Sequence, residues 1–412
     1  MKKISVRTIF TFPFKFRRKN KSDLLKSISP ERTRISDEMS SSALQKKIGA
    51  LNILKFLLVS ITFLFHWNIH YSISYKNTLL NNFITAGAFS MSGFFILSGF
   101  LLYYAHQNSD FQNFSYLIYY FKKKLIKILP LSYFLVALML LLSIFIDHKY
   151  IEWPLISMNI IPLQAFFPGM FNYFLNGGLW FISVLLFLYL LFPYFYHIVK
   201  SIQNVKRFLL FTYILGIFPL VINCYYPNPA LYHLPYFRIC EFLMGMITCK
   251  IFIKSKKGEC RIFYILFMLL IIFFSVSILF KNNFFNDVKF GNNYMYYDTV
   301  ILIFFPITVL QISKNTFLND IFNNKFSDFL GNIAYSFYIA QFVCIYIVDH
   351  TFKVNNYYGM DKTLFLILSF LLNLFIAIIF YEIFEKRISK KLFIFFSLSS
   401  LQKNTQKKEY VK

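Results

Sequence analysis

FFILSGFLLYY, residues 94–104, is the stretch that decides the fold, because it is an apolar run without a single charged residue. Apolar runs recur along the whole chain, and at about 20 residues each is long enough to cross a hydrocarbon core of roughly 30 Å. In lipid the backbone polar groups must pair within their own segment, so such runs form helices. The sequence therefore predicts an all-α fold, a polytopic transmembrane helical bundle.

The composition supports this fold class. Hydrophobic residues make up 57% of the chain, aromatic residues 21% and charged residues only 15%, whereas soluble domains carry about 25% charged residues. A net charge of +25 would suggest nucleic-acid binding in a soluble protein, but here the Lys and Arg residues gather in the tails and in alternate loops. We therefore expect no nucleic-acid partner. The cysteines are scattered without metal-ligand spacing, so we expect no metal site.

About ten spans are predicted, joined by loops that are alternately rich and poor in Lys and Arg. Basic loops stay in the cytoplasm, so both termini are expected on the cytoplasmic side. The spans are roughly 49–69, 83–104, 129–147, 178–198, 207–224, 236–252, 261–280, 294–313, 327–351 and 362–384. The outer loops would hold only Lys76, Lys149, Lys281, Lys289, Lys353 and Lys362.

The two ends of the chain are polar and basic. Residues 1–47 and 392–412 are expected to be cytoplasmic tails, the first of them mostly disordered, and residues 48–391 to form the membrane domain. The chain begins like a signal peptide, but its apolar part is short and contains Pro13 and Lys15. The sequence leaves open whether Met1 or Met39 is the true start.

Two ionisable residues, Lys55 and His66, interrupt the first span and are 11 residues apart. They therefore share one face of a helix and lie about 16 Å apart along it. Ionisable side chains within a span are costly and usually face the bundle interior or a wet cavity. Each also has a structural explanation, since Lys55 can extend to the interface and His66 can bond a neighbouring helix.

Two further motifs lie in the second span and just before the third. Ser98 and Gly99 belong to a group of small residues that let helices pack closely, and a glycine there also lets a ligand chain pass close to the backbone. Lys124 and Lys127 in FKKKLIKILP, residues 121–130, project from one helix face. Such a pair either sets the topology or binds phosphate groups.

Polar residues also mark two later spans. Trp180 stands near the start of GGLWFISVLLFLYLLFP, residues 177–193. Arg238 and Glu241 are one helical turn apart in RICEFLMGM, residues 238–246. They either pair within their helix or take part in substrate binding.

These motifs resemble, in order, those of acyltransferase family 3, membrane enzymes that transfer acyl groups to envelope sugars. That family has a basic residue and, after ten intervening residues, its essential histidine, as in Lys55 and His66. Its Ser-Gly-Phe motif matches residues 98–100, and its two arginines before a proline correspond to Lys124 and Lys127. Later resemblances are the tryptophan-led span at 177–193, AYSFYIAQF at 334–342 with Gln341 where a histidine is frequent, and YEIFEKRISKK at 381–391 with Arg387 in place of a proline.

The resemblance implies an acyltransferase of the bacterial inner membrane with His66 as general base or transient acyl carrier. The donor would be acyl-coenzyme A, most simply acetyl-coenzyme A, with no permanently bound cofactor. The acceptor would be a hydroxyl of a cell-surface polysaccharide such as lipopolysaccharide, or of a lipid-linked sugar. A polysaccharide-unit flippase, polymerase or transporter is the alternative, and the oligomeric state is left open. The substrate-binding residues would be Lys55, Ser98, Gly99, Lys124, Lys127, Trp180, Arg238 and Glu241.

Overall fold

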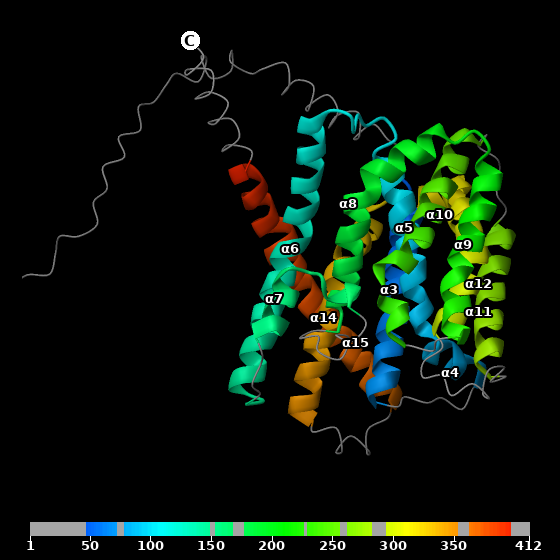
Figure 1. The fold of residues 1–412 in the computed structure, drawn as a ribbon. Coiled ribbons are helices and arrows are strands. Elements are labelled where there is room, and N and C mark those ends of the chain that lie inside the picture. Colours follow the sequence, from blue (N-terminus) through cyan, green and yellow to red (C-terminus); the bar gives the residue numbers. More distant parts are fainter. Residues whose placement is uncertain are drawn as a thin grey trace, which may run out of the picture. The chain divides into compact units, whose positions relative to one another are not determined.

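Helices make up nearly all of the chain that the computed structural model describes (Figure 1). Within that part there is no β-strand, and the predicted all-α fold is confirmed. The predicted tails lie outside the described residues, apart from Lys47 and residues 392–396. The described residues are 47–71, 78–148, 153–167, 177–225, 229–255, 262–281, 294–352 and 362–396.

Each predicted span falls largely on one of the long helices, except that the first residues of the span at 83–104 belong to α4 and η1. Within the described part of the chain, eight helices are long and apolar enough to cross a membrane. The two other long helices differ, because α10 carries charged residues along its length and the apolar part of α11 covers only Tyr264–Val276. The long helices are α3 (Gly49–Tyr71), α5 (Ser90–Ala105), α6 (Phe114–Phe145), α8 (Leu179–Ser201), α9 (Val205–Tyr225), α10 (Pro235–Lys254), α11 (Ile262–Lys281), α12 (Tyr294–Lys314), α14 (Lys325–Phe352) and α15 (Lys362–Phe380).

Shorter helical segments join or extend these helices. A π-helix, η6, follows α15 directly and covers Tyr381–Ile388. The remaining short elements are α4 (Thr78–Thr85), η1 (Gly87–Phe89), α7 (Trp153–Ile160), η2 (Gln164–Phe166), η4 (Pro229–His233) and α13 (Thr316–Phe322).

Helix α6 begins well before the predicted start of its span near residue 129. The side chain of Asn113 caps it by accepting hydrogen bonds from the backbone nitrogens of Ser115 and Tyr116 at 3.0 and 3.3 Å. The basic residues that follow gave no hydropathy signal for a span, which explains the late predicted boundary. As a result Lys124 and Lys127 lie inside a continuous helix, as their spacing predicts.

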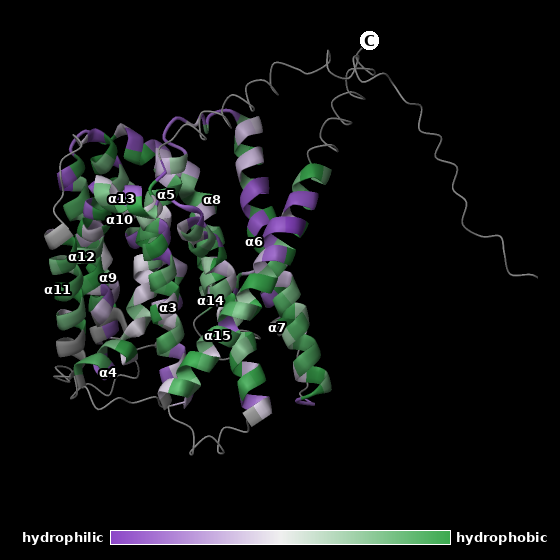
Figure 2. Cartoon of the chain, turned by 180° about the vertical axis from the view of Figure 1, so that it is seen from behind, coloured by the Kyte–Doolittle hydropathy of each residue, from purple (hydrophilic) through white to green (hydrophobic). Residues whose placement is uncertain are grey.

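We name the two ends of the bundle by their residues. The basic end is where α3, α6, α9 and α14 begin and α5, α8, α10 and α12 end, and the far end is opposite. Contacts between these termini define the basic end: Ser327 Oγ donates to the main-chain oxygen of Gly49 at 2.7 Å, and Lys250 Nζ to that of Val199 at 2.6 Å. Figure 2 shows hydrophilic residues on the upper part of α6 and on the helix that crosses it.

The centre of the bundle is built on a close contact between α5 and α10. A Cβ atom added to Gly99 would overlap the main-chain oxygen of Phe242, and one added to Gly245 would overlap that of Ile96. Small residues allow this approach of two helix backbones. Of the most apolar 18-residue stretch within Gly87–Ala105, 78% is buried, against 11% within Val205–Asn223, so α5 lies in the core and α9 at the periphery.

Candidate active site

His66 lies in the last third of α3, toward the far end, and is half-buried. Its Nδ1 is 2.7 Å from Oε1 of Gln341, a fully buried residue of α14. Its ring packs against that of Phe342, with 5.0 Å between ring centroids. The imidazole is therefore held by α14 through one hydrogen bond and one ring contact.

The contact with Gln341 fixes the tautomer of His66. The Gln341 amide nitrogen donates to the main-chain oxygen of Val59 at 3.3 Å, so the amide oxygen faces His66 and must accept. Nδ1 then carries the hydrogen, and Nε2 keeps a lone pair. Among the described residues Nε2 has no hydrogen-bond partner. A neutral imidazole with an unprotonated Nε2 is the form that a general base requires.

The start of the tryptophan-led helix α8 lies beside His66. A Cβ atom added to Gly177 would come within 2.6 Å of the ring of Phe342, which also touches His66. Trp180 is buried and packs its ring against His233 at 4.7 Å and Tyr232 at 5.5 Å. Burial and, to a lesser extent, the charge of Arg238 hold the pKa of His233 well below its usual value. The predicted site residue Trp180 is thus part of a neutral aromatic cluster.

Arg238 and Glu241 form a buried ion cluster with Asp298 of α12. One guanidinium nitrogen, NH1, donates to Glu241 Oε1 at 2.5 Å, to Asp298 Oδ2 at 3.0 Å and to Ser92 Oγ at 2.9 Å. The other guanidinium nitrogens donate to the main-chain oxygen of Tyr232. Arg238 is 2% exposed, Glu241 3% and Asp298 7%. The cluster joins α5, α10, α12 and η4 in the core.

Sequence reasoning found the Arg238–Glu241 pair but missed its partners. Asp298 closes the cluster, and Ser92 bridges by donating to Asp298 Oδ1 at 2.6 Å. The available signal was the isolated acidic residue in MYYDTVILIFF, residues 295–305, because a charge in an apolar helix needs a partner. Structural pairing and substrate binding were both left open for this pair, and the observed contacts are those of structural pairing.

A second charged cluster lies nearer the basic end, on α3 and α6. Lys55 Nζ donates to the main-chain oxygen of Gly331 at 2.7 Å. Lys124 Nζ lies over the rings of Tyr120 and Tyr189, 5.4 and 5.1 Å from their centroids. Lys127, one turn on from Lys124, is exposed. The predicted donor-binding lysines thus come together from two helices that are separate in sequence.

Glu385 of η6 is the acidic partner in this cluster and was not predicted. Its Oε1 accepts from Ser336 Oγ at 2.6 Å, and its charge interacts with those of Lys127 and Lys55. Ser389, four residues later, donates to the main-chain oxygen of Ile126 at 2.8 Å and ties η6 to α6. A π-helix is rare in proteins, and where one occurs it is frequently at a functional site. The lysine cluster therefore consists of Lys55, Lys124 and Lys127 with one carboxylate.

Gly99 stands on the face of α5 that meets α10, in backbone contact with Phe242, and the neighbouring Ser98 is half-buried. This contact accounts for the glycine by helix packing, which was one of its two sequence interpretations. Its other predicted role, as part of the path of a substrate chain, stays a prediction. Among the described residues no group of three or more His, Cys, Asp or Glu side chains could hold a metal ion.

Comparison with known families decides the class of protein. The family described as an acyltransferase domain, acyltransferase family 3, has a sequence model that matches residues 48–382. The chain belongs to acyltransferase family 3. It is therefore a membrane acyltransferase, and the resemblance of its motifs is confirmed at the level of the family. The match ends inside the predicted last motif, residues 381–391. No curated protein and no solved structure matches the chain significantly.

Proposed function

We propose that this acyltransferase moves an acyl group, most simply acetyl, from acyl-coenzyme A to a hydroxyl group of a cell-surface polysaccharide or lipid-linked sugar. The observation that carries the proposal is the state of His66, whose Nδ1 is bound by Gln341 and whose Nε2 has no hydrogen-bond partner among the described residues. Family membership supports acyl transfer over the alternative of a flippase, polymerase or transporter. We assign His66 as the general base.

In this reaction Nε2 of His66 takes the proton of the acceptor hydroxyl while the hydroxyl oxygen bonds to the thioester carbonyl carbon. The carbon–sulfur bond then breaks, and the same proton passes from Nε2 to the departing thiolate of coenzyme A. Products form without net uptake or release of a proton, and His66 returns to its neutral form. General-base catalysis of this kind contributes about 10²–10⁴-fold to the rate.

The lysine cluster supports binding of the donor. Lys55, Lys124 and Lys127 offer three ammonium groups against the single carboxylate of Glu385, and this surplus suits the phosphates of coenzyme A. Lysine binds phosphate as a point charge, without the bidentate geometry of arginine. The acyl arm would then reach from this cluster to His66, about 16 Å further along α3.

We also propose the sidedness. The helix ends and connections at the basic end carry many lysines, among them Lys122–Lys124, Lys200 and Lys254, and basic segments of membrane proteins stay in the cytoplasm. We therefore propose that the protein lies in the inner membrane of a bacterium. The donor would enter from the cytoplasm, and the acceptor would enter from the far end. His66 lies toward that far end, where an envelope glycan would arrive.

The test uses purified protein in detergent with acetyl-coenzyme A and envelope glycan, and it measures release of the coenzyme A thiol and acetylation of the glycan by mass. His66→Ala should lower the rate by about 10²-fold or more without changing thermal stability. His70→Ala is the matched control, because His70 lies one turn later on α3 and is exposed. Full acetylation by the His66→Ala protein would refute the assignment.

A second arm of the test separates direct transfer from a covalent relay. With labelled acetyl-coenzyme A and no acceptor, direct transfer leaves the protein unlabelled after denaturation. A label that is present in wild type and absent in His66→Ala would instead show that the imidazole carries the acyl group.

A further inference from the structure

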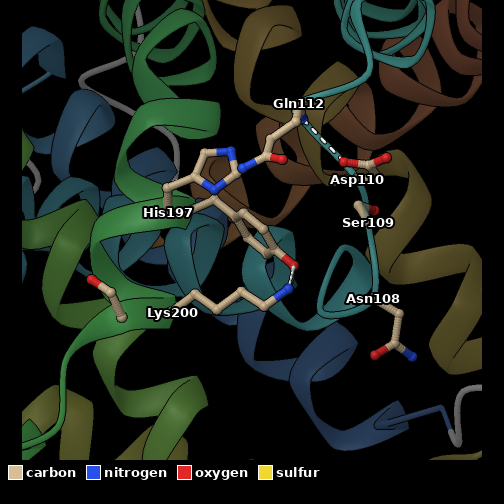
Figure 3. Close-up of a pocket in the computed structure, with 8 residues that line it drawn as sticks. Asn108, Ser109, Asp110, Gln112, His197 and Lys200 are labelled. Carbon is tan, nitrogen blue, oxygen red and sulfur yellow. Dashed lines mark hydrogen bonds between the residues drawn. The ribbon is translucent and has the colours of Figure 1, made fainter.

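A pocket of about 500 Å³, lined mostly by residues with polar or charged side chains, opens at the basic end, between the turn that joins α5 to α6 and the last turns of α8. The turn contributes Asn108, Asp110 and Gln112, and α8 contributes His197 and Lys200. Figure 3 shows these side chains around the pocket. None of the substrate-binding residues predicted from the sequence lines it, so the pocket is additional to the site described above.

The wall of this pocket is held by its own contacts. Tyr196 is fully buried, and its hydroxyl donates to the main-chain oxygen of Gln107 at 3.0 Å, which ties the turn to α8. Lys200 Nζ donates to the Tyr196 hydroxyl oxygen at 3.2 Å and lies 5.3 Å from its ring centroid. Lys250 Nζ donates to three main-chain oxygens at the end of α8. A ligand would therefore meet a Lys200 side chain that is already positioned, which lowers the cost of binding.

The chemistry of the lining fits a nucleotide better than an isolated phosphate. Lys200 supplies an ammonium group for one phosphate. The nearby carboxylate of Asp110 would repel a second anion, but it can accept hydrogen bonds from an amine. The side-chain amides of Asn108 and Gln112 both donate and accept, as the edge of a purine requires. His197 is exposed, and its ring can stack on a base.

A continuous path of contacts joins this pocket to the lysine cluster. Ser109 is also in the pocket wall, and its Oγ is 3.0 Å from Nδ1 of His106. The His106 ring packs on Tyr120 at 5.3 Å, and Tyr120 in turn carries the ammonium of Lys124. Burial and, to a smaller degree, the charges of Lys124 and Lys123 lower the pKa of His106 to about 3. The link between the two sites is thus neutral at physiological pH.

The separation of the two sites along α8 suits one extended ligand. Tyr189, which lies under Lys124, and Tyr196, which holds Lys200, are both on α8. Two helical turns separate them, which is about 10 Å along the helix. A molecule with phosphates at two places, one beside a purine nucleoside and one leading to a flexible arm, could occupy both positions.

We propose that this pocket binds the phosphorylated adenosine end of the acyl-coenzyme A donor. Lys200 contacts the phosphate on the ribose, the turn residues contact the adenine edge, and His197 stacks on the base. The diphosphate then reaches Lys124, and the pantetheine arm continues toward His66. This inference rests on the proposed donor, and it adds a nucleotide subsite to the lysine cluster.

Binding of adenosine 3′,5′-bisphosphate to the full-length protein in detergent tests the subsite without any turnover. Lys200→Gln removes the charge and keeps a polar contact to Tyr196, and it should weaken binding by about tenfold. His197→Ala should weaken it by about fivefold or more. Lys206→Ala, an exposed lysine at the start of α9, is the matched control and should leave binding unchanged. Wild-type affinity in both pocket variants would overturn the proposal.

A kinetic arm separates failure of the subsite from failure of the proposed function. Lys200→Gln should raise KM for acetyl-coenzyme A by about tenfold and leave kcat unchanged. KM for acetyl-4′-phosphopantetheine, which lacks the nucleotide, should not change. If neither donor is turned over but Lys200→Gln still weakens bisphosphate binding, the proposed reaction is refuted and the nucleotide site is retained. An unchanged KM in an active enzyme would refute the site.

A phosphate could also come from an anionic lipid. The same variants are therefore compared in nanodiscs of phosphatidylcholine alone and with added phosphatidylglycerol. One outcome is that phosphatidylglycerol raises the thermal stability of wild type but not of Lys200→Gln, while the two proteins bind the bisphosphate with the same affinity. In that case the pocket binds lipid headgroups, and the nucleotide assignment is wrong.

Discussion

Two charged clusters occupy this bundle, and they differ in burial and in the sign of their excess charge. In the core, Arg238 donates to Glu241, to Asp298 and to a main-chain oxygen, and all three ionisable side chains are at least 90% buried. On α3 and α6, three lysines share the one carboxylate of Glu385, and Lys127 is exposed. The first cluster holds one guanidinium between two carboxylates and is buried in the core, whereas the second has an excess of basic groups within reach of solvent.

The difference indicates different roles. A buried charge without its partner is very costly, so the contacts of Arg238 hold four elements of the core together. Surplus charge on an accessible surface costs little and attracts anions. We therefore expect substitutions in the Arg238 cluster to affect folding, and substitutions in the lysine cluster to affect donor binding.

The largest effect should follow from Arg238→Met. It leaves two buried carboxylates without their cation and should lower the free energy of unfolding by about 3–5 kcal/mol. Thermal or chemical unfolding in detergent measures this. Lys127→Ala should stay within about 0.5 kcal/mol of wild type. If Arg238→Met proved as stable as Lys127→Ala, the core cluster would not be structural and the comparison would fail.

Donor affinity should fall in Lys127→Ala. Loss of one charge-assisted contact should raise KM for acyl-coenzyme A by about tenfold, and added salt should weaken binding in wild type. Lys127→Arg should bind at least as well as wild type, because guanidinium suits phosphate. Lys122→Ala removes the same charge from an exposed position on the same helix and serves as control. Equal KM values for the two alanine variants would remove Lys127 from the donor site.

Gln341→Leu should act on kcat rather than on KM, because Gln341 orients His66 and touches neither cluster of charges. Loss of one neutral hydrogen bond predicts a decrease in kcat of about fivefold. Gln341→Glu keeps an acceptor oxygen for Nδ1 and should recover most of the rate. A change in KM without a change in kcat would place Gln341 in substrate binding instead of positioning.

The smallest effect is expected for Glu385→Gln. Removing the carboxylate leaves the lysines with more unmatched charge, so KM for the donor should fall by about two- to fivefold. Glu382→Gln is the control, because Glu382 pairs with Lys386 on the exposed side of η6. A higher KM in Glu385→Gln would mean that Glu385 holds the lysines in position rather than competing with the phosphates.

The positions of the helices could be predicted from sequence, as could some neighbours within one helix. Each predicted span is a helix because hydropathy is a local property and a lipid environment leaves the backbone no alternative. Arg238 and Glu241 pair as their spacing predicts. The predicted span at 129–147 covers only the second half of α6, because the basic segment before it has no hydropathy signal, although the spacing of Lys124 and Lys127 already placed them on one helix face.

Contacts between residues far apart in the chain were decided only by the tertiary structure. Ser92 meets Asp298 across 206 positions, and His66 meets Gln341 across 275. The backbone contact of Gly99 with Phe242 likewise depends on how α5 lies against α10.

The sequence by itself determined the helices, the family resemblance and the residues able to carry charge, because each depends on residue type and local spacing. Which charged groups meet, which nitrogen of His66 is hydrogen-bonded and where a pocket opens depend on packing between helices, and the sequence carries no local signal for them.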